Sequence, residues 1–294
     1  MKNFRIYIAV LSIALAALVA MVLNAGRSEA GKSHQGAAAQ SSKSTGVSGK
    51  PVQRNAVLRN ELNWVLGGKP QRGWYLYTPL ISRLLNTDRD VTSDGFASAL
   101  ARWQKKSGLA ASGVLDEETF YAIVAEWQGA RLKSRDAPSP DQLITAPISD
   151  FYDPTRAEEL RQVERQTYAA YKRMVAAAIS DRSLGLAHGV KSAKDELAPT
   201  EKYLKIISAF RSREYQEKLR RETPNAGRAG LAVNSPHFTG RALDLYVGGE
   251  PVETNDPNRA VQVKTRVYLW LVRNAERFGF RPYFYEPWHW EYVK

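Results

Sequence analysis

The chain has 294 residues, of which 44% are hydrophobic and 24% charged, and this ordinary composition excludes a wholly disordered, collagen-like or polytopic membrane protein. It contains no cysteine, which excludes disulfides, thiolate metal sites and a cysteine nucleophile. The net charge of +12 favours a polyanionic neighbour such as nucleic acid, anionic lipid or an acidic wall polymer.

The first segment has the pattern of an export signal. Lys2 and Arg5 precede Ile6 to Leu23, a run without charged residues. This run is long for a signal-peptide core and barely long enough to span a bilayer, so residues 1–30 are either a cleaved signal peptide or an N-terminal membrane anchor through residues 6–23. In both cases the basic start predicts that the rest of the chain is exported, to the periplasm or cell envelope. An exported protein is not expected to bind nucleic acid.

A flexible linker and a helical domain are expected next. Residues 31–54 are the predicted linker, because Gly31 to Lys50 is rich in small and polar residues and has no aromatic one. Residues 55–130 are expected to form a small bundle of short helices, with Ser93 and Asp116 near the starts of two of them. The apolar residues at helical spacing are Val57, Leu58, Leu62, Val65 and Leu66, ended by Gly67-Gly68; Leu80, Ile81, Leu84 and Leu85; Phe96, Ala99, Leu100 and Trp103; and Phe120, Ile123, Val124 and Trp127.

The predicted bundle resembles a known family. The residues that carry the resemblance are Asp94-Gly95, Ala99, Trp103-Gln104, Gly108-Leu109, Ser112-Gly113-Val114 and Thr119-Phe120. Through them, residues 70–128 are similar to the peptidoglycan-binding-domain-like family of small helical modules. This resemblance implies that the bundle binds cell wall. Aromatic residues at helical spacing are also what a helical core requires, so a purely structural role for the rings stays open.

After a proline-rich linker over residues 131–153, residues 154–294 alternate between helical and strand patterns. The expected fold is therefore α+β, with a small antiparallel sheet flanked by helices. We predict helices from Asp153 to about Ile179, from Arg213 to Arg221 and from Asn258 to Phe278, with strands from Tyr203 to Phe210, from Ala242 to Val247 and in the last residues.

Two histidines lie in segments that suit a metal site. In the strand predicted from Ala242, leucines would face the core and Asp244 would point to the opposite side. Gly240 would let the chain turn and bring His237 back beside Asp244. Together with His289, this makes two imidazoles and one carboxylate, the ligand set of a catalytic zinc site that keeps a position for water. We predict that His237, Asp244 and His289 bind Zn²⁺.

A general base is expected beside this metal, and two glutamates compete for the role. On an ideal strand Glu291 would share a face with His289, whereas Glu286 would point the other way. Pro287 cannot donate a strand hydrogen bond, so regular pairing should begin after it and leave Glu286 in a loop that can curl toward the metal. We therefore predict Glu286 as the base.

The same segments resemble the zinc-dependent D-Ala-D-Ala carboxypeptidases, the VanY-like peptidases of the M15 group. The match comprises Ser-x-His-x-x-Gly-x-Ala-x-Asp at 235–244, Glu-Pro-Trp-His-Trp at 286–290, and Ser208-Ala209-Phe210-Arg211-Ser212 with Gln216. The resemblance implies zinc bound by His237, Asp244 and His289, Glu286 as general base, and Arg211 stabilising a substrate carbonyl or carboxylate. We also predict substrate contacts for Gln216, Ser235 and Trp288, although Trp288 and Trp290 could equally pack in the core.

The leading interpretation is an exported zinc peptidase that removes the terminal D-Ala from peptidoglycan stem peptides, with muropeptides as its partners. A wall endopeptidase that cuts, for example, L-Ala–D-Glu would use the same metal ligands, so it stays open. A non-catalytic wall-binding protein and a non-haem iron oxygenase are further alternatives, the latter because it also uses two histidines and a carboxylate.

Overall fold

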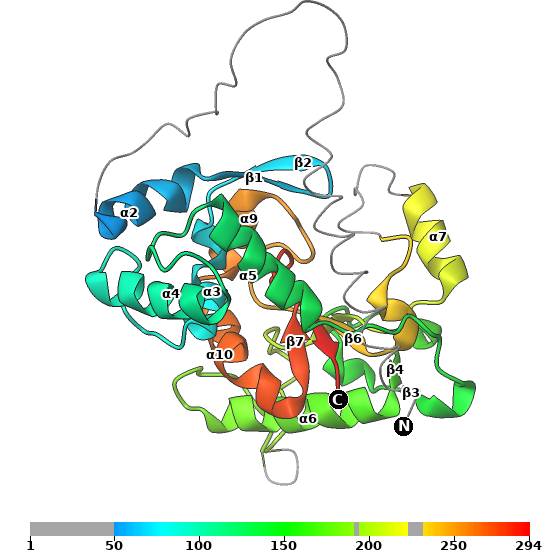
Figure 1. Cartoon of the computed structure of the whole chain (residues 1–294). Helices are drawn as coiled ribbons and strands as arrows, with labels where there is room; N and C mark the ends of the chain where they lie inside the picture. The colour runs from blue at the N-terminus through cyan, green and yellow to red at the C-terminus, as the bar shows by residue number, and fades with distance from the viewer. Residues whose placement is uncertain (1–49, 191–193, 223–231) are drawn as a thin grey trace, which may run out of the picture. The chain divides into compact units, whose positions relative to one another are not determined.

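The structure is a computed structural model and describes residues 50–190, 194–222 and 232–294. Its first portion, the helical part (residues 50–130), contains α2 (Pro51–Glu61), the 3-10 helix η1 (Tyr75–Tyr77), α3 (Thr78–Leu84), α4 (Asp94–Lys106) and α5 (Glu117–Gly129) (Figure 1). The predicted leader and the residue 31–49 portion of the predicted linker lie outside the described residues. Among the described residues, no helix is both long and apolar enough to cross a membrane.

The starts of α4 and α5 confirm the predicted caps. The hydroxyl of Ser93 accepts a hydrogen bond from the Phe96 amide at 3.2 Å, and the carboxylate of Asp116 accepts one from the Thr119 amide at 3.0 Å. Each cap satisfies a donor that the first helical turn leaves unpaired. The apolar residues predicted for these helices, such as Phe96 and Phe120, are buried.

The predicted first helix is wrong in its second half. Helix α2 ends at Glu61, and β1 (Asn63–Leu66) pairs in antiparallel fashion with β2 (Lys69–Arg72). Gly67 and Gly68, which we expected to stop a helix, form the two-residue turn between these strands, with φ angles of 57° and 80°. A turn with two positive φ angles matches the twist of a β-hairpin, and glycine adopts it without steric cost.

The C-terminal part of the chain, called the α+β part below, has the predicted α+β fold. Its sheet has four antiparallel strands in the order β5 (Ile206–Ser208), β6 (Ala242–Leu245), β8 (His289–Tyr292) and β7 (Phe280–Pro282). Helix α6 (Arg165–Ser180) runs along one side of the molecule in Figure 1, and its buried stripe joins the core that contains the leucines of β6. Helix α7 spans Arg213–Glu222, close to its predicted bounds.

Two long predicted helices are shorter than expected, and both differences arise from caps. The helix predicted from Asp153 begins only at Arg165, after η4 (Glu158–Leu160) and β4 (Gln162–Glu164), because the Glu164 carboxylate accepts from the amides of the first turn. The helix predicted from Asn258 to Phe278 is divided into α9 (Asp256–Gln262), α10 (Arg266–Asn274) and η8 (Ala275–Phe278). The hydroxyl of Thr265 accepts from the Tyr268 amide at 3.1 Å and so starts α10.

Residues 131–153, expected to be a linker, contain regular elements. These are η2 (Pro140–Gln142), β3 (Leu143–Thr145) and η3 (Ile148–Asp150). Strand β3 pairs with β4, so this segment is tied to the start of α6.

The helical part and the C-terminal α+β part share one hydrophobic core, and the described residues from Lys50 onward belong to one compact unit. The ring of Phe284, in the loop before β8, lies 5.5 Å from that of Tyr77 and 5.6 Å from that of Trp127, measured between centroids. The buried guanidinium of Arg259 donates to the Tyr77 hydroxyl at 3.1 Å and to the Tyr285 carbonyl at 3.2 Å. The helical part therefore packs directly against the loop that carries Glu286.

Candidate metal centre

Strands β6 and β8 bring two predicted metal ligands together. Asp244 and His289 are directly opposite in the antiparallel register. Since side chains alternate between the faces of a strand, both point away from the side on which Leu243 and Trp290 enter the core. The Oδ1 atom of Asp244 lies 2.9 Å from Nδ1 of His289.

The third ligand comes from η7 (Pro236–Thr239), the short helix before β6. Ser235 caps this helix, and Gly240 ends it with a φ angle of 66°. A Cβ atom at position 240 would lie 3.0 Å from the Glu164 amide nitrogen, so the close turn requires glycine. The turn places Nε2 of His237 3.2 Å from Oδ2 of Asp244, which confirms the predicted return of His237 toward Asp244.

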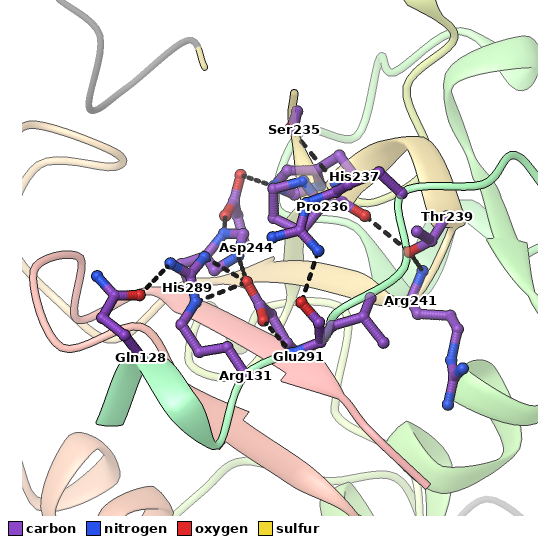
Figure 2. A network of polar contacts seen from close by, with 12 residues as sticks. Gln128, Arg131, Ser235, Pro236, His237, Thr239, Arg241, Asp244, His289 and Glu291 are labelled. Carbon is purple, nitrogen blue, oxygen red and sulfur yellow. Dashed lines mark hydrogen bonds and ion pairs between the residues drawn. The ribbon is translucent and has the colours of Figure 1, made fainter. Parts of the chain in front are cut away.

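The two imidazoles turn different nitrogens toward Asp244, and the outer nitrogen of each has an acceptor (Figure 2). Nδ1 of His237 is 2.6 Å from the carbonyl of Ala209, which can only accept, so this nitrogen is the donor and Nε2 keeps its lone pair. Nε2 of His289 is 3.2 Å from Oε1 of Glu291, and Nδ1 is 2.9 Å from Oδ1 of Asp244, so Nδ1 is the nitrogen placed to share a metal with Asp244. One ligand atom from each of His237, Asp244 and His289 lies within 4.8 Å of the others, and all three residues are buried.

The electrostatics of the cluster favour an ionised carboxylate between neutral or positive partners. Burial alone would raise the pKa of Asp244, but the imidazole of His237 and the guanidinium of Arg211 hold it well below its usual range. Burial lowers the pKa of His237 to about 4, with the positive charge of Arg211 adding to the effect. Burial also opposes the charge on His289, yet hydrogen bonds to Asp244 and Glu291 outweigh it and raise the pKa of His289 to about 9.

Glu286 is a buried glutamate, and one of its carboxyl oxygens makes no hydrogen bond to the described residues. Regular pairing of β8 begins at His289, after Pro287, so Glu286 lies in a loop as predicted. It is 6% exposed, and its Oε1 atom has no hydrogen-bond partner among the described residues. Burial raises its pKa to about 7, with the charge of Asp244 contributing in the same direction and the imidazole of His289 opposing it. A raised pKa and a free oxygen are what a general base near neutrality needs.

Glu291, the competing glutamate, is fully engaged. Its Oε1 accepts from Arg131 Nε at 3.0 Å and contacts His289, while its Oε2 accepts from the Leu132 amide at 2.9 Å. Burial would raise the pKa of Glu291, but the hydrogen bond to His289 and the charges of His289 and Arg131 lower it to about 2. Glu291 therefore acts as a partner of His289, and its partners leave it unsuited to be a base.

The other predicted site residues surround Asp244 or support the ligand segments. Arg211 donates from Nη2 to Oδ2 of Asp244 at 2.7 Å and from Nε to Ser208 Oγ at 2.7 Å. Gln216 is buried against Arg211, with its Oε1 3.4 Å from Nη1.

Ser235 accepts from the amide of His237 and so shapes η7. Trp288 is 3% exposed and belongs to the core; substrate contacts of these residues stay predictions.

Sequence reasoning missed Arg131, which it assigned to a linker. A weak signal for Glu291 existed, because alternation along the strand puts it on the face of His289. No local pattern pointed to Arg131, since it lies 160 positions before its partner.

Comparison with known proteins places part of the chain in a known family. Residues 160–294 match the family model VanY, described as D-alanyl-D-alanine carboxypeptidase. This part of the chain is a VanY-like peptidase domain. A solved structure of the LdcB LD-carboxypeptidase is similar over 55% of this chain and 72% of its own, with 23% sequence identity and a TM-score of 0.36. No curated protein matches the chain.

The VanY-like region contains all three candidate ligands as well as Glu286, Arg211 and Glu291. The helical part and Arg131 precede it. Binding of cell wall by the helical part, and the boundaries of the separate domains, stay predictions.

Proposed function

We propose that the chain is an exported, zinc-dependent peptidase that removes the terminal D-Ala from peptidoglycan stem peptides. The observation that carries the proposal is the convergence of His237, Asp244 and His289, with the charges of Asp244 and His289 acting on the buried Glu286, one oxygen of which is unpaired. The VanY family match supports the coarser statement, a peptidase acting on peptidoglycan.

The donor set fits zinc. Two imidazole nitrogens and one carboxylate oxygen are a usual protein ligand set for catalytic zinc, and the outer nitrogens of both imidazoles already have acceptors that orient the rings. His237 would bind through Nε2, His289 through Nδ1 and Asp244 through its carboxylate. A zinc ion held there would supply a Lewis acid for the scissile carbonyl and lower the pKa of water to about 7.

The side chains around these ligands would do the proton transfers and orient the substrate. Glu286 would accept the proton of the attacking water and return it to the departing amine, because its pKa of about 7 lets it take up and release a proton near neutrality and its Oε1 is unpaired. Arg211 uses three of its five N–H groups on Ser208, Gln216 and Asp244. The remaining two would bind the carboxylate or carbonyl of the substrate.

The envelope location rests on the export pattern of residues 1–30 and on the family match. The positive net charge suits a wall polymer rich in carboxylates. Through its proposed wall-binding role, the helical part would hold the peptidase near its polymer.

Product analysis by mass spectrometry tests the proposal. The full chain is incubated with a muropeptide that carries a pentapeptide stem. One sample contains zinc, and a second contains an excess of chelator. We expect loss of one alanine in the zinc sample and an intact stem in the chelated one. Cleavage between L-Ala and D-Glu would identify a wall endopeptidase, and an intact stem in both samples would support a non-catalytic wall-binding protein, which the free Glu286 oxygen argues against.

A further inference from the structure

Glu291 connects a candidate metal ligand to the segment that follows α5. Its carboxylate is completely buried and receives hydrogen bonds from two directions. From β8 itself, Nε2 of His289 lies 3.2 Å from Oε1. From the segment after α5, Arg131 donates to Oε1 through both Nε and Nη2, and the amide of Leu132 donates to Oε2 at 2.9 Å.

The segment after α5 is itself well held, so it can fix the carboxylate. Nη1 of Arg131 donates to Oε1 of Gln128, in the last turn of α5, at 2.9 Å. The guanidinium of Arg131 also lies over the ring of Tyr283, 4.0 Å from its centroid. Figure 2 shows Gln128, Arg131, Glu291 and His289 joined in one network of polar contacts.

Counting donors and acceptors shows why the identity of residue 291 matters. Every group that faces the carboxylate of Glu291 is a donor: the guanidinium of Arg131, the amide of Leu132 and the imidazole of His289. A carboxylate satisfies all of them, because it only accepts. With a metal bound at Nδ1, Glu291 would accept from the one remaining ring proton of His289, on Nε2.

We propose that Glu291 is a positioning residue for His289, held in place by Arg131 and Leu132, so that the segment after α5 forms part of the support of the metal centre. This inference rests on the proposed function, since it concerns zinc held by the same three ligands. It extends the site beyond the VanY-like region, because residues 131 and 132 precede residue 160.

Zinc affinity, measured by competition with a chelating indicator, tests the proposal independently of activity. Glu291→Gln keeps the size of the side chain but turns an NH₂ group toward a donor, whichever way the amide is oriented. We expect its zinc dissociation constant to rise about 10- to 100-fold, the usual effect of losing the hydrogen-bond partner of a metal-binding histidine. Arg131→Lys keeps the charge but loses the fork, so a smaller rise is expected.

Arg83→Lys is the matched control. Arg83 also joins the helical part to the α+β part through a glutamate, with Nη2 3.6 Å from Oε2 of Glu276, but neither residue touches the metal centre. Its zinc affinity should equal that of the unmodified protein. Affinities of Glu291→Gln and Arg131→Lys that also equal it would overturn the proposal.

The tautomer of His289 gives a readout that a merely structural role would not move. In the zinc-loaded, ¹⁵N-histidine-labelled protein, long-range proton–nitrogen spectra should show the His289 proton on Nε2. Glu291→Gln should weaken or shift this signal and leave the His237 signal, which depends on Ala209, unchanged. An unchanged His289 signal would contradict the proposal, and if Glu291→Gln does not fold, Arg131→Lys decides. Failure of the unmodified protein to bind zinc would instead overturn the proposed function, and this inference with it.

Discussion

Asp244 and His289 face each other across two neighbouring antiparallel strands, with Oδ1 of Asp244 2.9 Å from Nδ1 of His289. Residues directly opposite in an antiparallel pair have Cβ atoms about 4.5–5.5 Å apart, so the strand register itself brings these two side chains together. The turn at Gly240 then adds His237 to this pair, so two ligands are fixed by strand register and the third by one short helix. The predictions below follow from this arrangement.

Replacement of the proposed base should strongly slow catalysis and leave the metal in place. We expect Glu286→Gln to lower kcat by about 10²- to 10⁴-fold, because a positioned base contributes that much. D-alanine release from a pentapeptide stem measures the rate, and metal analysis of the same sample serves as the control. Activity near that of the unmodified protein would refute the role of Glu286.

Removal of a metal ligand should lower the zinc content as well as the activity, unlike replacement of the base. His237→Ala is expected to lower the zinc content of the purified protein together with its activity, since only two ligands remain. His188→Ala is the control, because His188 is exposed and lies outside the ligand cluster. Elemental analysis after dialysis compares the two, and equal zinc contents would argue against His237 as a ligand.

A methyl group at position 240 should destabilise the protein and disturb the site. Gly240→Ala forces an alanine into a positive φ, which costs about 1–2 kcal/mol, and adds the close contact with the Glu164 amide. Gly185→Ala is matched to it, since Gly185 has a φ angle of 65° and nothing near the new methyl group. Urea denaturation should show a larger loss of unfolding free energy for Gly240→Ala, and only this variant should lose zinc affinity. Equal losses would mean that the contact with Glu164 relaxes freely.

Lysine should not replace the arginine beside Asp244. We expect Arg211→Lys to lower kcat/KM about 10- to 100-fold, because a hydrogen bond to a charged group is worth ~1.5–3 kcal/mol and lysine cannot serve Ser208, Gln216, Asp244 and substrate together. Arg220→Lys, at an exposed position in the last turn of α7, should leave kcat/KM unchanged. Steady-state kinetics on the pentapeptide stem measures both, and equal values for the two variants would exclude a substrate contact by Arg211.

Local sequence was enough to predict the parts of the site that depend on neighbouring residues. The alternation around Asp244, the turn at Gly240 and the break at Pro287 are short-range features, and the structure has all three. The same holds for the caps of α4 and α5, where one side chain meets an amide three residues later. Each of these features is decided by backbone sterics or by hydrogen bonds within a single turn.

Only the tertiary structure decided the rest. Apolar spacing around Val65 fitted a helix as well as a strand, and the Gly67-Gly68 turn with its pairing partner β2 selected the strand. Thr265 likewise fitted one continuous helix, but its hydroxyl donates to the carbonyl of Val247 at 2.8 Å, a contact 18 positions away, and also caps α10. The bond between Arg131 and Glu291 joins residues 160 positions apart, and such a contact leaves no periodic trace in the sequence, because it depends on how separate elements pack. Local sequence therefore predicted the candidate ligands and the base. The contacts that hold these residues in place depend on packing between distant segments, which local sequence does not show.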